Sequence, residues 1–183
     1  RALMPIGKFK ASKSLMRLAR KRPFQITMNK AFVDVVRSCA IVNRTETWIN
    51  QEIENLFISL NKMKYAHSIE CWQKKKLVGG IYGIALGGVF FAESMFSCVS
   101  NGSKIALINL VARLWENGFK ILDVQFLNSH LLQFGAYEIT KTKFKQDLEK
   151  AIQIKIEFYS LPSTDDDFFN CLSTFLQARI EIS

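Results

Sequence analysis

The sequence predicts an α+β fold, with a mixed and mainly antiparallel sheet covered by helices. The first observation is the order of its patterns: a strand, two helices, three strands of a meander, a helix, a strand and a helix. The second is the pair Gly87-Gly88 between two apolar runs, which is typical of a hairpin turn. The third is a strongly apolar helical pattern from 103 to 118, which fits the crossover between two parallel strands.

The elements follow one another from a loop over 1–11, which contains Pro5 and Gly7. Ser12, Asn29, Asn50 and Ser103 are the expected N-caps of four helices. Pro23 ends the first helix, and Gly118 stops the fourth. The expected helices cover 13–22, 29–41, 50–63, 103–118, a short stretch from 128 to about 135, and 141–151; the expected strands cover 24–28, 67–72, 77–85, 89–92 and 119–126.

The chain divides into a domain over 1–151 and a C-terminal tail over 152–183. In the tail we expect a strand near 154–159, an acidic loop at 165–167 and then a helix. The length of 183 residues and the 49% hydrophobic content suit one domain with a small appendage. No apolar run reaches membrane length, and neither a signal peptide nor a membrane partner is expected. The four cysteines are scattered and there are two histidines, which does not fit the ligand spacing of a zinc site, so we expect no metal and no cofactor.

The positive charge is concentrated at one end of the chain. Residues 1–30 hold nine Lys or Arg and no acid, whereas residues 31–183 hold sixteen basic and sixteen acidic residues. A localised basic stripe is typical of proteins that bind a polyanion, although a merely solvated basic face is the alternative. The candidate phosphate-binding residues lie on and just after the first helix: Lys13, Arg17, Arg20, Lys21 and Arg22.

Two stretches combine apolar residues with a few polar groups. The run 89–97 places Glu93, Ser94 and Ser97 among aromatic residues, in a strand that we expect to end in a loop. The strand 119–126 contains Asp123 and Gln125, two positions apart and therefore expected on one face. Both stretches lie toward the carboxyl ends of neighbouring parallel strands, where open sheets bind ligands. The alternatives are an ordinary core strand and a structural hydrogen-bonded pair.

The order of seven motifs resembles the leucyl/phenylalanyl-tRNA–protein transferases over about residues 1–150. The combination of Gly-Gly-x-Tyr-Gly, Glu-Ser-Met-Phe-Ser and Asp-x-Gln-x-x-Asn is specific, whereas any one of them alone is weak. The matching stretches are 14–32, 47–49, 67–70, 78–83, 93–97, 103–104 and 123–128. The resemblance implies a catalytic domain like the acyl-CoA N-acyltransferase fold. We expect the family's additional N-terminal segment, whose aromatic residues help to hold the terminal adenosine, to be absent here.

The resemblance also implies a reaction and its partners. Leu or Phe, and Met weakly, would move from aminoacyl-tRNA onto the N-terminal Arg or Lys of a protein, which marks that protein for degradation in the cytoplasm. Gln125 would position the attacking amine with Asp123 in support, and Glu93 would bind the α-ammonium of the aminoacyl group. Trp48 would stack on a base or close the pocket, unless it is a core residue. The expected apolar wall consists of Phe90, Met95, Ile81, Leu107 and Leu122.

Other candidates and functions are set aside at this point. His67 and His130 lack a nucleophile at a recognisable spacing, and Glu70 is expected on a strand surface. An acyl-CoA-dependent N-acyltransferase would need a glycine-rich loop before the helix at 103, but residues 100–104 contain one glycine. A non-catalytic RNA-binding module would need the basic helix and would have no use for the pair Asp123 and Gln125.

Overall fold

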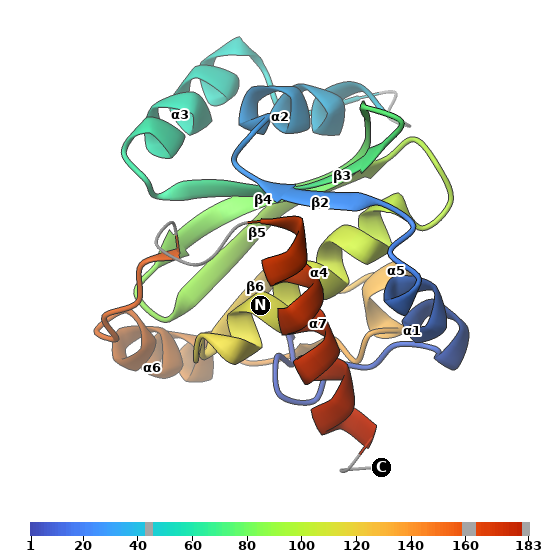
Figure 1. Cartoon of the computed structure of the whole chain (residues 1–183). Helices are drawn as coiled ribbons and strands as arrows, with labels where there is room; N and C mark the ends of the chain where they lie inside the picture. Colours follow the sequence, from blue (N-terminus) through green and yellow to red (C-terminus); the bar gives the residue numbers. More distant parts are fainter. Residues whose placement is uncertain (43–45, 159–163, 181–183) are drawn as a thin grey trace.

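The computed structural model describes residues 1–42, 46–158 and 164–180, which form a seven-stranded sheet in the order β2-β3-β4-β5-β6-β1-β7 (Figure 1). β5 and β6 pair in parallel, and the other neighbouring strands pair antiparallel. The predicted α+β fold with one parallel switch is therefore confirmed. The strands are β1 (Ala2–Met4), β2 (Gln25–Met28), β3 (Ala66–Gln73), β4 (Lys76–Leu86), β5 (Val89–Ser97), β6 (Ile121–Gln125) and β7 (Tyr137–Glu138).

Helices cover both faces of the sheet (Figure 1). One face packs its apolar side chains into a single cluster with α1, α4 and α7, and the other packs against α2 and α3. α6 packs against Leu3, Val89 and Ile121. In the part of the chain that the structure describes, no helix has the length and apolar character needed to cross a membrane. The helices are α1 (Lys13–Arg20), α2 (Phe32–Ile41), α3 (Gln51–Lys62), α4 (Gly102–Glu116), α5 (Ser129–Leu132), α6 (Lys141–Ala151) and α7 (Asp165–Ile180).

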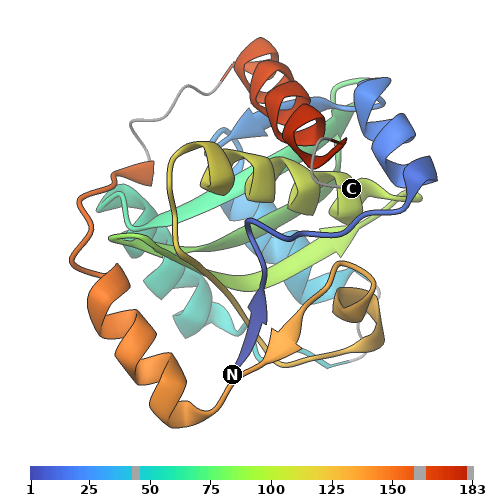
Figure 2. The same cartoon turned by 90° about the horizontal axis from the view of Figure 1, so that it is seen from below.

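The first residues form a strand, and the prediction of a loop over 1–11 is wrong for Ala2–Met4. β1 lies between β6 and β7 and pairs antiparallel with both (Figure 2). A run of three residues is too short to show alternation, so its extended conformation comes from these two distant neighbours. β1 thereby brings the beginning of the chain to the end of β6.

Two of the four expected N-caps are present, and the other two predictions are wrong. Ser12 and Asn50 each accept a hydrogen bond from a backbone N–H in the first turn of α1 and α3, and Asn128 does the same for α5. Asn29 does not cap α2, because its side chain accepts from the backbone N–H of Ser68 at 2.9 Å. Ser103 does not cap α4 either: its own N–H donates to Oγ of Ser97 at 3.0 Å, so a side chain from the end of β5 caps this helix.

The tail joins the main core through α7. Its inward side chains belong to the cluster that also holds α4, and they are Phe168, Cys171, Leu172, Phe175 and Leu176. The acidic residues Asp165, Asp166 and Asp167 form the first turn of α7 and not the expected loop, which suits the positive end of the helix dipole. The expected strand near 154–159 is wrong for 154–158, which contain no strand, and residue 159 lies outside the described residues.

Candidate active site

Glu93 lies at a bulge in β5. Across the β4–β5 pairing, Tyr82 lies opposite Ser94 and Gly83 opposite Ala92, which leaves Glu93 without a partner in the ladder. The expected loop after residue 92 is therefore a strand that continues to Ser97. A bulge bends the strand and redirects a side chain, and it often lies beside an active site. Here it directs the half-buried carboxylate of Glu93 toward β6.

The bulge depends on a glycine in the neighbouring strand. A Cβ atom at Gly83 would lie 2.1 Å from the carbonyl oxygen of Phe91 and 2.5 Å from the Phe90 ring. Both contacts are far shorter than van der Waals distance, so no other residue fits without a backbone shift. The glycine at the end of the motif 78–83 is thus what allows the neighbouring strand to form the bulge at Glu93.

β6 ends in a tight turn at Gln125. Gln125 has φ of 66°, in the left-handed region that costs a residue other than glycine about 1 kcal/mol or more. Its backbone N–H donates to Oδ1 of Asp123 at 2.8 Å, which holds this turn. The strand alternation that predicted one shared face for the two side chains therefore does not extend to Gln125. The two residues are coupled instead through the backbone.

The carboxamide of Gln125 reaches across to β5. Its Nε2 donates to Oε2 of Glu93 at 2.8 Å and to the carbonyl oxygen of Ala92 at 3.3 Å. Because the amide nitrogen faces these acceptors, the carboxamide oxygen is directed away from them. The structure therefore brings Glu93, Asp123 and Gln125 together, as the two sequence stretches predicted.

Arg1 is the fourth member of this cluster. The sequence did not indicate it as a site residue, because it was one of nine basic residues in 1–30. Its Nε and Nη2 both donate to Oδ2 of Asp123, at 3.0 and 2.7 Å. The Asp123 side chain is fully buried, whereas that of Arg1 is 38% exposed. A buried carboxylate needs a cation or several donors, so the search for a partner of Asp123 was the signal that could have indicated Arg1.

The electrostatics of the cluster centre on Glu93. Burial raises the pKa of the Glu93 carboxyl above its usual range, and the Asp123 charge adds to that rise. The hydrogen bond from Gln125 and the positive charge of Arg1 act in the opposite direction on this pKa. The hydrogen bond and the Arg1 charge thus do not fully offset the cost of burying the ionised Glu93 carboxylate. Such a carboxylate favours the binding of an additional cation.

The proposed apolar wall lies in one cluster beneath the sheet. Ile81, Phe90, Leu107 and Leu122 are buried there, and Met95 packs against them partly buried. Trp48 is separate: it is 47% exposed, and its ring meets Phe57 edge-on at 6.3 Å in the cluster on the opposite face. A hollow of about 790 Å³ lies beside the β1–α1 segment, and Leu122 is the member of the wall that borders it.

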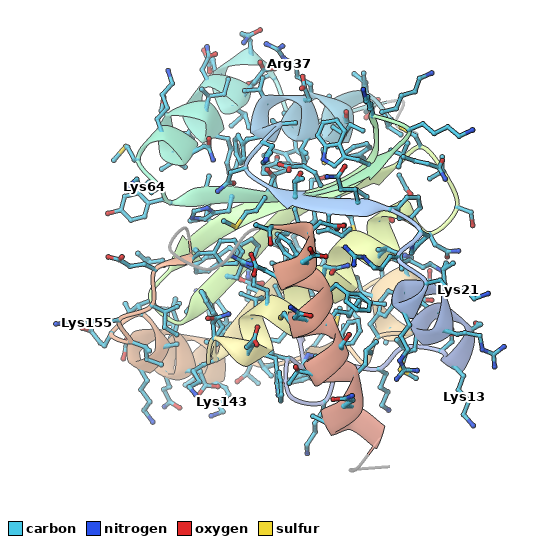
Figure 3. All side chains as sticks on the ribbon, in the orientation of Figure 1. Lys13, Lys21, Arg37, Lys64, Lys143 and Lys155 are labelled. Atoms are coloured by element: carbon cyan, nitrogen blue, oxygen red, sulfur yellow. The ribbon has the colours of Figure 1, made fainter. Side chains whose placement is uncertain are left out.

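The basic helix α1 is exposed, with one change from the expected set. Lys13, Arg17, Arg20 and Lys21 are exposed, and Lys13 and Lys21 point outward from α1 (Figure 3). Arg22 instead pairs with Asp165 at 2.6 Å and Asp166 at 2.9 Å, and its guanidinium lies 4.8 Å from the centroid of the Phe169 ring. The first turn of α7 therefore neutralises Arg22, while the other four cations face solvent.

Comparison with known proteins identifies the family. A family model described as leucyl/phenylalanyl-tRNA protein transferase matches residues 3–149. The leucyl/phenylalanyl-tRNA–protein transferase of Phenylobacterium zucineum is 47% identical over 171 residues, which cover 90% of this chain and 77% of the relative. The relatives of the same name from Rhodospirillum rubrum and Caulobacter vibrioides are 48% and 42% identical, and cover 86% and 97% of this chain and 75% and 82% of their own lengths.

The chain belongs to the leucyl/phenylalanyl-tRNA–protein transferase family, as the resemblance indicated. Membership in this family makes the protein an aminoacyltransferase. The N-terminus of α4 also differs from a coenzyme A site: a Cβ at Gly79 would lie 2.7 Å from the carbonyl carbon of Gly102, and Ser97 already accepts the Ser103 N–H. One of the backbone N–H groups that a pyrophosphate would need at this helix end is therefore already occupied.

The structure also shows the surroundings of His67, His130 and Glu70, which the sequence analysis set aside as catalytic candidates. His67 is buried, its Nδ1 lies 3.0 Å from Nδ2 of Asn29, and burial lowers its pKa to about 4. Burial also lowers the pKa of His130. The expectation for Glu70 is wrong, because Glu70 is fully buried and not on a strand surface.

Glu70 is held entirely by donors from the protein. Its carboxylate accepts from the hydroxyls of Thr27 and Ser68, the latter at 2.6 Å. It also accepts from the backbone N–H groups of Lys30 and Ala31, at 3.4 and 3.3 Å, and thereby anchors the segment that precedes α2. Strand alternation gave no signal for this role, because β3 is buried on both faces.

Proposed function

We propose that this family member transfers Leu or Phe, and Met weakly, from aminoacyl-tRNA to the N-terminal Arg or Lys of proteins. The observation that carries the proposal is the contact between Gln125 and Glu93 at the carboxyl ends of two parallel strands. It joins a carboxylate with a raised pKa to a carboxamide whose oxygen faces away from it. We also propose that the product is a destabilising N-terminus and that the reaction takes place in the cytoplasm.

In the proposed complex, Glu93 binds the donor. The α-ammonium of the aminoacyl ester is a cation, and a half-buried carboxylate is its natural partner. One oxygen of Glu93 accepts from Gln125, and a carboxylate has further lone pairs for the ammonium. The donor's apolar side chain would then contact Met95 and the cluster of Ile81, Phe90, Leu107 and Leu122, with Trp48 on the base of the terminal nucleotide.

The chemical step is the aminolysis of an ester. The nitrogen of the acceptor's α-amine bonds to the ester carbonyl carbon, and the bond from that carbon to the ribose oxygen breaks. The amine loses one proton in the process, and the ribose oxygen gains one. An α-amine has a pKa near 8, so roughly a tenth of it is neutral at pH 7 and a strong base is unnecessary.

Gln125 would position the amine in this step. A carboxamide does not titrate, but its oxygen accepts a hydrogen bond from the attacking nitrogen and fixes its approach. Asp123 would support Gln125 through the bond to its backbone N–H. Because Arg1 already pairs with Asp123, we do not assign Asp123 a direct contact with the ammonium that develops in this step.

The exposed cations of α1 would bind the RNA backbone. Lys13, Arg17, Arg20 and Lys21 are exposed on a helix that contains no acid. Phosphate binding by such residues is sequence-independent and weakens with salt. We leave Arg22 out of this surface because Asp165 and Asp166 neutralise it.

The test is transfer of radiolabelled Leu from Leu-tRNA to matched peptides. We expect transfer to peptides that begin with Arg or Lys and little transfer to the same peptide beginning with Ala or carrying an acetylated N-terminus. Equal transfer to the Arg and Ala peptides would contradict the acceptor specificity. Binding of Leu-tRNA without any transfer would favour a non-catalytic RNA-binding protein instead.

A further inference from the structure

Asp123 is the most completely enclosed charged group of the site, and both of its oxygens are engaged. Oδ1 accepts the backbone N–H of Gln125, and Oδ2 accepts two donors from Arg1. Asp123 is fully buried, so these protein groups enclose its carboxylate. A carboxylate in this position cannot remove a proton from a substrate while these bonds persist. Its function must therefore pass through Gln125 or through Arg1.

Arg1 is held in place from three directions. The backbone N–H of Ile139 donates to the carbonyl oxygen of Arg1 at 3.0 Å. Its guanidinium lies 5.7 Å from the centroid of the Phe144 ring of α6. The next residues, Ala2 and Leu3, pair with Gln125 and Asp123 in an irregular register that bridges the turn at the end of β6. Contacts with β1, with Ile139 just after β7 and with α6 thus fix Arg1 beside the turn at the end of β6.

We propose that Arg1 is a positioning residue for aminoacyl transfer, which holds Asp123 so that Asp123 maintains the left-handed turn at Gln125. This proposal rests on the proposed function, because the turn matters only if Gln125 receives the attacking amine. Without the guanidinium, the buried Asp123 carboxylate must protonate or move toward water. Either response weakens its bond to the Gln125 N–H, and the carboxamide then loses its fixed position beside Glu93.

The first experiment compares Arg1→Gln with Arg37→Gln in the full chain. Arg37 is a close match, since its Nε and Nη2 also both bind one oxygen of a carboxylate, Oε1 of Glu54, at 2.9 and 2.8 Å. Arg37 lies on α2, across the sheet from α1 and α4 (Figure 3). We expect Arg1→Gln to lower the single-turnover rate about tenfold to a hundredfold, the effect of a misplaced reacting group, and to change donor affinity less than about threefold. Arg37→Gln should transfer normally.

Two further variants separate positioning from other roles. Arg1→Lys restores a cation at this place, and its rate should recover to within about threefold of the unaltered protein. Arg1→Gln combined with Asp123→Asn should be only about twofold slower than the slower single variant, because both act on one turn. Losses that multiply would overturn the proposal. So would a loss that appears wholly as weaker donor binding, because that would indicate direct contact with RNA.

The pH dependence of donor binding gives another readout. Among the described residues, the charged groups that act on Glu93 are Arg1 on β1 and Asp123 on β6. Removal of the Arg1 charge should therefore shift the acid-side loss of donor affinity to higher pH, and Arg37→Gln should leave it unchanged. An unshifted acid limb in Arg1→Gln would contradict the proposed geometry.

A measurement without substrate distinguishes failure of this proposal from failure of the proposed function. The Gln125 amide proton bonds to a carboxylate, and its NMR resonance should move in Arg1→Gln but not in Arg37→Gln. If the unaltered protein transferred no amino acid, the proposed function would fail while this comparison still tested Arg1. A Gln125 resonance that is identical in both variants would overturn the positioning role. If Arg1→Gln did not fold, Arg1→Met, which keeps the apolar stem of the side chain but not its charge, would carry the same two comparisons.

Discussion

Two buried carboxylates in this protein, Glu70 and Asp123, are equally hidden from water but are satisfied in different ways. Glu70 accepts hydrogen bonds from two hydroxyls and two backbone N–H groups, all within the fold. Asp123 accepts from one backbone N–H and from the guanidinium of Arg1. The Glu70 network is complete, whereas the network of Asp123 continues through Gln125 to the half-buried Glu93. Burial of a carboxylate therefore does not by itself indicate function.

The largest effect should follow from removal of the structural carboxylate. Glu70→Ala leaves the donors of Thr27, Ser68 and the chain before α2 without an acceptor, at a cost of about 1–3 kcal/mol for each buried donor. Urea unfolding should show a loss of roughly 3 kcal/mol or more in the free energy of unfolding, with the exposed Glu149→Ala as the control. An unchanged midpoint would mean that the comparison between the two carboxylates is mistaken.

Asp123→Asn should act chiefly on the rate of transfer. The substitution keeps the shape of the side chain but removes the charge that pairs with Arg1, so the turn at Gln125 is held less firmly. We expect single-turnover transfer to fall by about tenfold to a thousandfold, while filter binding of a non-hydrolysable aminoacyl-adenosine analogue stays nearly constant. Asp123→Asn with Gln125→Ala should lose little more than the worse single variant. A normal rate in Asp123→Asn would contradict the role in transfer and would indicate that Asp123 is a structural residue only.

Neutralisation of the basic helix should have a smaller and salt-dependent effect. Arg17→Gln with Lys21→Gln removes up to two phosphate contacts, and each contact contributes roughly 0.9 to the slope of log affinity against log salt. The affinity for all aminoacyl-tRNAs should fall by the same factor. A fourfold rise in salt concentration lowers the affinity of the unaltered protein by some factor, and in the double variant that factor should be about tenfold smaller. Arg22→Gln is the control, because Asp165 and Asp166 already neutralise that charge. Discrimination between tRNA sequences by the double variant would contradict the assignment to phosphates.

The smallest effect near neutral pH should come from the titration of Glu93. Only the ionised form of Glu93 attracts the donor's ammonium, and burial raises its pKa. Donor affinity should therefore be constant at neutral pH and decline as the pH falls through this raised pKa, sooner than for an exposed glutamate. Glu93→Gln should bind the donor weakly at every pH and lose this acid limb. An acid limb that is unchanged in Glu93→Gln would assign the titration to another group.

The sequence predicted the fold where local patterns were strong. Apolar periodicity indicated α3 and α4, and the double glycine indicated the hairpin of β4 and β5. β1 was missed because its three residues take their conformation from β6 and β7, and the first turn of α7 was missed because three consecutive acids are more typical of a loop. Pairing across the sheet and capping from other elements are not encoded in local periodicity.

The site was predicted as a set of residues but not as a geometry. The motifs indicated Glu93, Asp123 and Gln125, and these three residues are in contact. The bulge at Glu93, the left-handed Gln125 and the contact with Arg1 depend on register between strands that are distant in the sequence. Arg1 and Asp123 are 122 positions apart, so no spacing rule could pair them.

The most direct test of the account is single-turnover transfer of Leu from Leu-tRNA to a peptide beginning with Arg, measured for Gln125→Ala. Gln133→Ala is the matched control, because Gln133 is exposed and its amide donates to the carbonyl oxygen of His130. The account predicts that Gln125→Ala transfers about tenfold to a thousandfold more slowly with nearly unchanged donor affinity, and that Gln133→Ala transfers normally. A normal rate in Gln125→Ala, or a loss that lies wholly in donor binding, would contradict the role of Gln125 in positioning the amine.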